Sequence, residues 1–102
     1  NGLEASIPHP QVVIQDDILN QSRIHTVVVC GLTSNVGRAS APGNVLLDVG
    51  EANLSRQSVV EVSKLSTVAK TQFGGYLGSL SKQRVNQILA GMQFLQRSFL
   101  SR

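Results

Sequence analysis

The stretch TVVVCGLTS, residues 26–34, carries the strongest strand signal in the chain. Three consecutive valines favour a β-strand because branched side chains fit a pleated surface, and polar residues bound the apolar run. We therefore predict a strand over residues 24–32 that ends beside Thr33 and Ser34. Its apolar residues do not alternate with polar ones, which predicts burial on both faces, as in a closed or strongly curved sheet.

Four further short segments are apolar or β-branched and are separated by polar breaks. They cover residues 11–15, 45–48, 58–61 and 65–68. The last two are predicted as separate strands because Ser63 and Lys64 interrupt the pattern between them. About five short strands in a chain of 102 residues indicate a single, mainly β domain over residues 1–102.

Only the C-terminal segment has the pattern of a long helix. Ser81 is a suitable N-cap, and Arg97 in the last turn suits the helix dipole. Apolar residues recur at spacings of three and four, and we predict that this stripe packs against the sheet: Val85, Ile88, Leu89, Met92, Leu95 and Phe99. Strands followed by one terminal helix predict a small curved barrel with a helix packed on it.

Residues 33–44 separate two predicted strands and are rich in loop-forming residues. The segment contains Gly37, Ser40, Pro42 and Gly43, with Arg38 near its middle. Long loops in small compact domains are more often functional than not. We therefore expect residues near this loop to contribute to a functional site.

Charge is unevenly distributed along the chain. Residues 1–61 contain six acidic and three basic residues, a net charge of −3, whereas residues 62–102 contain six basic residues and no acidic one. This asymmetry favours an anionic partner, either a nucleic acid or an acidic peptide. A solvated basic face explains the same distribution, so composition leaves both interpretations open.

Hydrophobic content gives no sign of a membrane protein or of a secretion signal. No apolar run reaches the roughly 18–20 residues that span a bilayer. Residues 1–4 lack the basic start and the apolar stretch of a signal peptide. We therefore expect a soluble, cytoplasmic protein without a membrane partner.

Several kinds of site are excluded by the residues present. One cysteine and two isolated histidines cannot build a closed metal site, and Cys30 lies in an apolar run typical of a buried thiol. The glycines at 74, 75 and 78 lack the Lys-Ser/Thr ending of a phosphate-binding loop, and no GxSxG motif occurs. We expect no metal and no cofactor.

Six short motifs follow one another in a specific order along nearly the whole chain. They are PHPQVVIQDD (8–17), TVVVCGLTS (26–34), PGNVLLD (42–48), RQSVV (56–60), TVAK (67–70) and LGSLS (77–81). Each motif is weak alone, but their order and spacing resemble the MazF/PemK family of toxin endoribonucleases. The chain is therefore identified as a MazF/PemK-like toxin.

This resemblance implies a partly open SH3-like barrel, a homodimer and metal-independent cleavage of single-stranded RNA. In that scheme a ribose 2′-hydroxyl attacks the adjacent phosphate, which requires RNA rather than DNA. It also implies a cognate antitoxin protein as a partner. By position, Thr33 matches the catalytic threonine of the family and His9 its key arginine, and the neighbouring RNA contacts fall on Ser34, Asn35, Arg38 and Lys64.

Three departures from the family pattern bear on activity. Histidine at position 9 exchanges protons near neutral pH, whereas an arginine stays charged and grips phosphate with a planar fork. Ser63-Lys64, Ser66 and Ala69 replace the Asp/Glu-Gln, Arg and Asp of relatives. The first strand of the family has no counterpart before Gly2, so we expect the encoded protein to be longer.

Two other functions remain open from the sequence. One is a catalytically impaired, toxin-like module that binds RNA or an antitoxin-type protein without cleavage. The other is a structural SH3-like domain. His9 is the residue that separates an active nuclease from an impaired one, because it replaces the arginine of the family.

Overall fold

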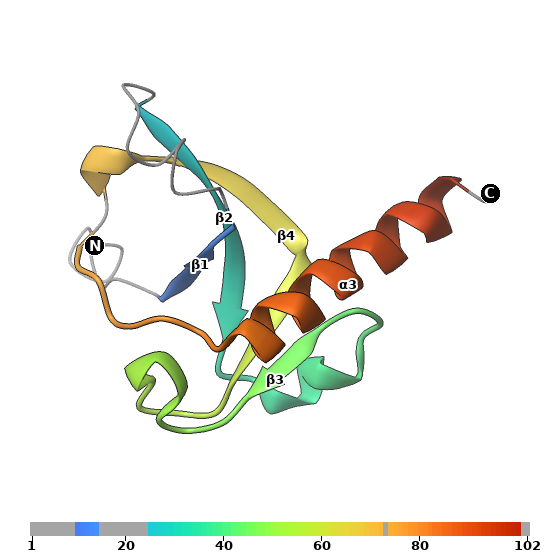
Figure 1. Cartoon of the computed structure of the whole chain (residues 1–102), viewed down its shortest axis with the longest axis horizontal. Coiled ribbons are helices and arrows are strands. Elements are labelled where there is room, and N and C mark those ends of the chain that lie inside the picture. The colour runs from blue at the N-terminus through green and yellow to red at the C-terminus, as the bar shows by residue number, and fades with distance from the viewer. Residues whose placement is uncertain (1–9, 15–24, 73, 101–102) are drawn as a thin grey trace, which may run out of the picture.

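In the computed structural model, the described residues form a curled half-barrel of four antiparallel strands, and a C-terminal helix packs against it (Figure 1). The structure describes residues 10–14, 25–72 and 74–100. Its strands and helices are β1 (Gln11–Val13), β2 (Thr26–Thr33), η1 (Val36–Ser40), β3 (Val45–Leu47), η2 (Glu51–Asn53), β4 (Ser58–Ala69), η3 (Lys70–Gln72) and α3 (Lys82–Leu100). The η elements are short 3₁₀ helices. The predicted mainly β half-barrel with a terminal helix is confirmed.

The sheet order is β1-β2-β4-β3, so β4 lies between two strands that precede it in the chain. Segment 34–44, which contains η1, must therefore carry the chain past the start of β4 to reach β3. Val59 of β4 pairs with Thr33 of β2 on one side and with Leu46 of β3 on the other. As a result, the end of β2 and the η1 segment meet at one end of the sheet.

The core lies between the sheet and α3. It contains Cys30, Val45, Leu47, Leu54, Val60, Val62 and Ile88, with Val12, Leu32 and Met92 among the partly buried residues packed against it. Burying each large side chain contributes roughly 1.5–3 kcal/mol, which is the main stabilising term of a domain this small. Since Cys30 and Leu32 face this core, the alternation of side chains turns Gly31 and Thr33 to the opposite face of β2.

The prediction of two separate strands at 58–61 and 65–68 is wrong, because β4 is continuous over twelve residues. The polar break nevertheless has a structural consequence. Glu61 pairs with Gly31, and Leu65 pairs with Cys30. Between these two pairs, β4 advances by four residues while β2 advances by one. The strand accommodates Ser63 and Lys64 as a bulge instead of ending there.

The start of α3 agrees with the prediction from the sequence. The Ser81 hydroxyl accepts a hydrogen bond from the Arg84 backbone N–H at 3.2 Å, which satisfies one of the free donors at the helix N-terminus. No helix among the described residues has the length and the apolarity needed to span a bilayer.

The prediction that the whole apolar stripe of α3 packs on the sheet is wrong for half of its residues. Ile88 is buried, and Met92 and Leu95 pack against the core. Val85 and Leu89, by contrast, remain 42% and 47% exposed, and Phe99 is more exposed still. Two geometric reasons account for this. α3 crosses the sheet and its C-terminal half, which includes Phe99, extends past the strands (Figure 1). Val85 and Leu89 each lie one residue after the side of the helix that faces the core, and are therefore turned about 100° away from it.

Two glycines allow this crossing. Gly91 lies on the buried side of α3, and a Cβ placed there would lie 2.1 Å from the carbonyl oxygen of Gly43. Gly43 itself has φ +84°, a conformation that favours glycine. The helix backbone therefore lies directly on the backbone of the loop that precedes β3.

Candidate functional site

Thr33 is the last residue of β2, and its hydroxyl is already part of a local turn. Its Oγ1 accepts a hydrogen bond from the Asn35 backbone N–H at 3.2 Å, a bond that does not use the hydroxyl proton. The side chain is half-buried and faces away from the core. A hydroxyl held in this way is suited to donate a hydrogen bond to an anionic group that reaches the end of β2.

Asn35 ties the end of β2 to η1. Its side-chain Oδ1 accepts from the Gly37 N–H at 3.1 Å and caps the 3₁₀ helix, while its carbonyl oxygen accepts from the Arg38 N–H at 3.0 Å. Ser34, between Thr33 and Asn35, is exposed. The loop expected over residues 33–44 thus contains a capped helical turn, and Arg38 is exposed on it.

Asn44 anchors this segment to the sheet. Its Nδ2 donates to the Arg38 carbonyl oxygen at 3.0 Å, and its Oδ1 accepts from the Val62 backbone N–H at 3.1 Å. One amide side chain therefore joins the backbone of η1 to the bulge of β4. Because both bonds are to backbone groups, they fix the position of the loop independently of the exposed side chains on it.

Lys64, the predicted RNA contact on β4, forms an ion pair with Glu61. The Lys64 Nζ lies 3.3 Å from the Glu61 Oε2, and the side chains are 59% and 9% exposed, respectively. A Cβ built on Gly31 would lie 3.4 Å from the Lys64 Cβ and 3.9 Å from its Cδ. The stem of Lys64 therefore lies over Gly31, two residues from Thr33 and on the same face of β2.

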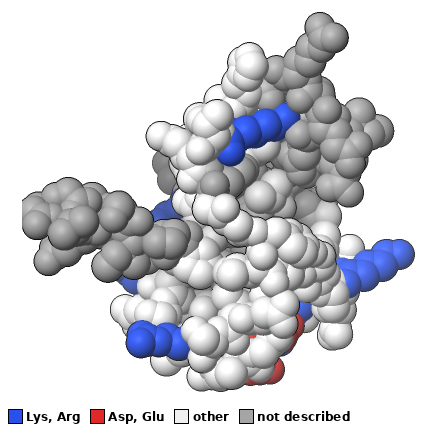
Figure 2. All heavy atoms as spheres, turned by 90° about the vertical axis from the view of Figure 1, so that its left-hand side faces the viewer, with Lys and Arg blue, Asp and Glu red and all other residues white. Residues whose placement is uncertain are grey.

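Basic side chains do not form one continuous patch on the face shown in Figure 2. Lys and Arg protrude there singly and well apart, and Asp and Glu lie together near one edge. The charge asymmetry of the sequence therefore does not become a basic stripe on this face.

Cys30 is a buried core thiol, as predicted. Burial raises the pKa of Cys30 to about 11, and the nearby negative charge of Glu61 adds to this effect. The thiol donates a hydrogen bond to the Glu61 carbonyl oxygen at 2.9 Å. A thiol this hard to ionise is not a nucleophile at neutral pH. Among the described residues, no group of three or more His, Cys, Asp or Glu side chains could hold a metal ion.

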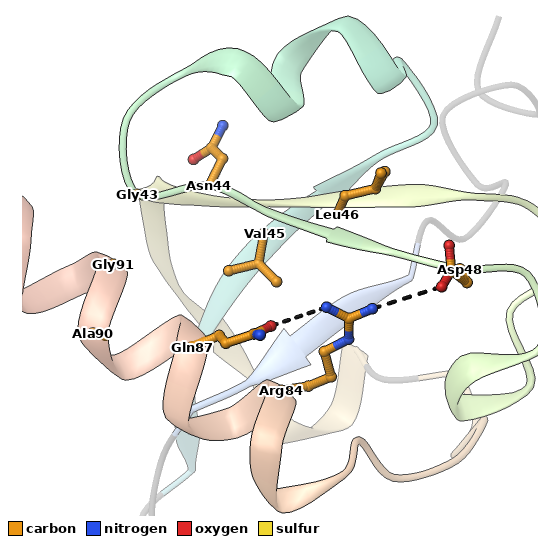
Figure 3. A pocket seen from close by; sticks show the side chains of 9 residues that line it. All are labelled: Gly43, Asn44, Val45, Leu46, Asp48, Arg84, Gln87, Ala90 and Gly91. Atoms are coloured by element: carbon orange, nitrogen blue, oxygen red, sulfur yellow. Dashed lines mark hydrogen bonds and ion pairs between the residues drawn. The ribbon is translucent and has the colours of Figure 1, made fainter.

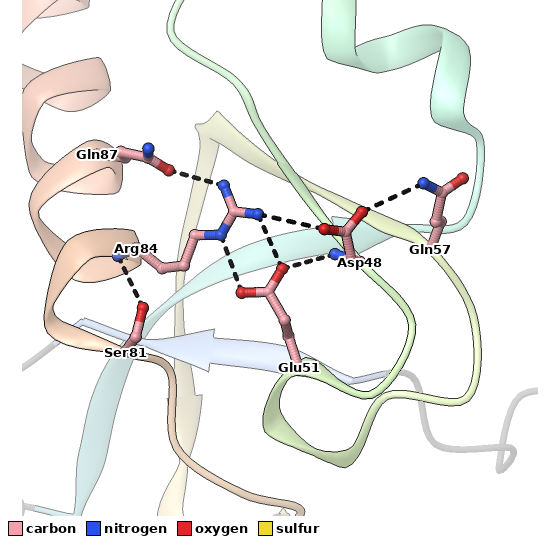
Figure 4. A network of polar contacts seen from close by, with 6 residues as sticks. All are labelled: Asp48, Glu51, Gln57, Ser81, Arg84 and Gln87. Carbon is pink, nitrogen blue, oxygen red and sulfur yellow. Dashed lines mark hydrogen bonds and ion pairs between the residues drawn. The ribbon is translucent and has the colours of Figure 1, made fainter.

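A second polar cluster joins the start of α3 to the turn after β3 (Figure 4). The Arg84 guanidinium donates from Nε and Nη2 to the two carboxylate oxygens of Glu51, each at 2.9 Å, and from Nη1 to the Gln87 Oε1. Asp48 lies 3.7 Å from the Arg84 Nη2. This bidentate geometry is the strong form of an Arg–carboxylate pair.

The Arg84–Glu51 pair predicts a pH-dependent contribution to stability. The hydrogen bonds from Arg84, together with the backbone N–H of Asp48, hold the pKa of Glu51 below its usual range. The contribution is therefore complete above the ordinary carboxyl pKa and is lost as pH falls through the lowered value. Glu51→Gln is expected to lose roughly 1–2 kcal/mol in urea unfolding at pH 7, and much less at pH 3.

Asp48→Asn serves as the control, since Asp48 makes the longer contact and is 67% exposed. It is expected to change stability by less than about 0.5 kcal/mol. An equal loss for Glu51→Gln at both pH values would show that the carboxylate charge is not the source of the stabilisation.

An open groove of about 650 Å³ lies between β3 and α3, and Arg84 and Gln87 line part of it (Figure 3). The three guanidinium nitrogens of Arg84 are all engaged by Glu51, Asp48 and Gln87. The positive charge of Arg84 in this groove is therefore neutralised by carboxylates of the same chain. None of the residues predicted as site residues lines the groove.

The sequence matches the description "PemK-like, MazF-like toxin of type II toxin-antitoxin system" over residues 1–95. This chain belongs to the PemK-like, MazF-like toxin family. Endoribonuclease MazF6 of Mycobacterium tuberculosis and endoribonuclease MazF2 of Mycobacterium bovis are each 33% identical to it over 93 residues, 91% of this chain and 82% of the relative. Endoribonuclease MazF of Staphylococcus saprophyticus is 26% identical over 87 residues, 85% of this chain and 72% of the relative.

The fold of the PemK-like, MazF-like family is also seen in a solved structure. The Mycobacterium tuberculosis toxin MazF-mt6 superposes with a TM-score of 0.73, over 82% of this chain and 81% of that one. At 18% identity, this similarity establishes the half-barrel with its terminal helix.

The predicted site residues that the structure describes lie at the end of β2, directly after it or beside it. Thr33, Ser34 and Asn35 are contiguous, Arg38 follows on η1, and Lys64 reaches the same face of β2 over Gly31. His9 lies outside the described residues.

Asn44 and Glu61, which contact the η1 segment and Lys64 respectively, were not predicted from the sequence. The sequence does contain a signal for Glu61: this acidic residue stands among valines in the run 59–62. Acidic residues are rare in such buried strand segments unless they are paired. Asn44 has no comparable signal, since asparagine after Pro42-Gly43 is ordinary loop sequence.

Proposed function

We propose that this chain is the toxin of a type II toxin–antitoxin pair and an endoribonuclease that cleaves single-stranded RNA without a metal ion. The observation that carries the proposal is the family match over residues 1–95, with relatives named endoribonucleases. Its support in the structure is the position of Thr33 at the end of β2, where the one hydrogen bond seen among the described residues leaves its hydroxyl proton unused, beside a capped loop that bears Arg38.

The proposed reaction is an internal transesterification. The ribose 2′-oxygen forms a bond to phosphorus, the bond between phosphorus and the 5′-oxygen breaks, and the products are a 2′,3′-cyclic phosphate and a 5′-hydroxyl. One proton leaves the 2′-hydroxyl and one is delivered to the departing 5′-oxygen. The Thr33 hydroxyl donates to a non-bridging phosphate oxygen, where negative charge builds up in the transition state.

His9 is assigned the proton transfer from its sequence position alone. An imidazole with a pKa near neutrality accepts and returns protons at the pH of the cell. Ser34, Asn35, Arg38 and Lys64 are assigned to binding of the RNA backbone. This site requires a 2′-hydroxyl in the substrate and no metal.

The proposal includes two protein partners. One is a cognate antitoxin, as the type II family description implies, and it is expected to suppress cleavage when added. The other is a second copy of the chain: α3 leaves Val85 and Leu89 about half exposed, a surface that a homodimer would cover. A monomer mass for the active species in light scattering would rule out the homodimer.

The deciding experiment is incubation of the protein with end-labelled single-stranded RNA in EDTA. Fragments that end in a 2′,3′-cyclic phosphate are expected, whereas the same sequence as DNA or as 2′-O-methyl RNA should stay intact. RNA binding without cleavage would instead indicate an impaired toxin-like module, because His9 replaces the arginine of the family. Absence of both binding and cleavage would overturn the proposal.

A further inference from the structure

Glu61 is a buried carboxylate on the face of the sheet that carries Thr33. The residue is 7% exposed, and its neighbours Val60 and Val62 point into the core, so the Glu61 side chain points to the opposite face. In the part of the chain that the structure describes, the side-chain partner of Glu61 is Lys64. A buried carboxylate is unfavourable unless a cation or donors compensate it, so Glu61 constrains where the Lys64 ammonium lies.

The bulge in β4 brings these two side chains together. Between the pairs Gly31–Glu61 and Cys30–Leu65 the strand contains three extra residues, 62–64, and these turn Lys64 back over β2. Gly31 has no side chain to block that path, and the stem of Lys64 lies against it. A regular strand would have placed residue 64 farther along the sheet, away from Glu61.

Lys64 and Thr33 consequently lie on the same face of β2. Gly31 and Thr33 are two residues apart, about 7 Å along the strand. The ammonium is anchored on its inner side by Glu61 and open to solvent on its outer side, since the Lys64 side chain is 59% exposed. An ammonium has three donors, so two remain for an anion when one is bound to Glu61.

We propose that Glu61 is a positioning residue, which holds the Lys64 ammonium in place to bind a backbone phosphate of the RNA next to the phosphate that Thr33 contacts. This inference rests on the proposed function and deepens it. An anchored lysine loses less rotamer freedom on binding than a free one, so the ion pair strengthens phosphate binding although Glu61 is itself negative.

A purely electrostatic role of Glu61 predicts the opposite effect of its substitution on RNA affinity. If Glu61 acted on RNA only through its charge, Glu61→Gln would raise the net charge by one and tighten binding. If Glu61 positions Lys64, the same substitution weakens binding despite the added positive charge. The sign of the change therefore separates the two roles.

The test is a double-mutant cycle on binding to a 2′-O-methyl oligoribonucleotide, measured at several salt concentrations. Lys64→Met is expected to weaken binding about 10-fold and to reduce the salt slope by about one. Glu61→Gln should weaken binding about 5-fold, with no further loss when it is combined with Lys64→Met. Thermal unfolding of each variant shows whether the fold is retained.

Each outcome has a definite meaning. If the wild type binds RNA and Glu61→Gln binds as tightly or more tightly, the positioning role is wrong while the proposed function stands. If the wild type does not bind RNA at all, both are overturned. Should Glu61→Gln fail to fold, the wild-type ammonium groups decide the matter by NMR: Lys64 should be clearly more ordered than the exposed Lys82, and equal disorder contradicts the proposal.

Discussion

Replacing Gly91 by alanine is expected to destabilise the protein by roughly 3 kcal/mol or more, with a fall in Tm of about 15 °C. The added methyl would lie 2.1 Å from the Gly43 carbonyl oxygen and 3.0 Å from its carbonyl carbon. Both are backbone atoms, which cannot turn aside as a flexible side chain can. Helix α3 would have to move off the loop, and Ile88, which is 3% exposed, would lose part of its packing.

Helix propensity alone predicts the reverse result for Gly91. Alanine inside a helix is more favourable than glycine by about 1 kcal/mol, so an uncrowded glycine would be stabilised by the same change. Gly75→Ala is the control for an uncrowded glycine outside the helix, because a Cβ there meets nothing within 4 Å. Urea and thermal unfolding of both variants test the prediction, and a Gly91→Ala protein as stable as the wild type would refute the close contact.

Replacing Thr33 by alanine is expected to lower the rate constant of RNA cleavage about 100-fold. Removal of one donor from a charged transition state typically has an effect of this size. RNA affinity should change only a few-fold, because Arg38 and Lys64 remain. The fold should be retained, since the substitution removes one hydrogen bond, from the Asn35 N–H to the Thr33 Oγ1.

Two further variants make the Thr33 prediction specific. Thr33→Ser keeps the hydroxyl and is expected to stay within about 10-fold of the wild-type rate. Thr67→Ala removes an exposed threonine near the C-terminal end of β4 and should cleave at the wild-type rate. Single-turnover cleavage measurements separate the chemical step from binding. Equal rates for wild type and Thr33→Ala would exclude Thr33 from the reaction.

For candidate residues that are contiguous in sequence, the sequence could predict where they lie relative to one another. Thr33, Ser34, Asn35 and Arg38 follow the best strand signal directly, so the strand end, the turn and the loop had to lie together. Lys64 was identified by position, but its ion pair with Glu61 was not. That pair depends on a register shift between β2 and β4, and register is a property of two strands rather than of either sequence alone.

The largest error concerned α3, and its cause is also non-local. The apolar stripe predicts correctly that the segment is an amphipathic helix that begins after Ser81. Spacing within the helix cannot show how much of its circumference the sheet covers, or how far along the helix the sheet extends. Val85 and Leu89 therefore look like core residues in sequence, although the described sheet leaves them half exposed.

By itself, the sequence determined the family, the strand that ends at Thr33, the buried thiol of Cys30 and the capped start of α3. These features depend on short-range signals, namely runs of branched residues, polar breaks and an N-cap, which act within a few residues of each other. Only the tertiary structure decided that β4 is continuous, that Lys64 lies over Gly31 beside Glu61, and that Gly43 contacts Gly91. Each of these is a contact between distant segments, whose partners are selected by packing and register once the chain has folded.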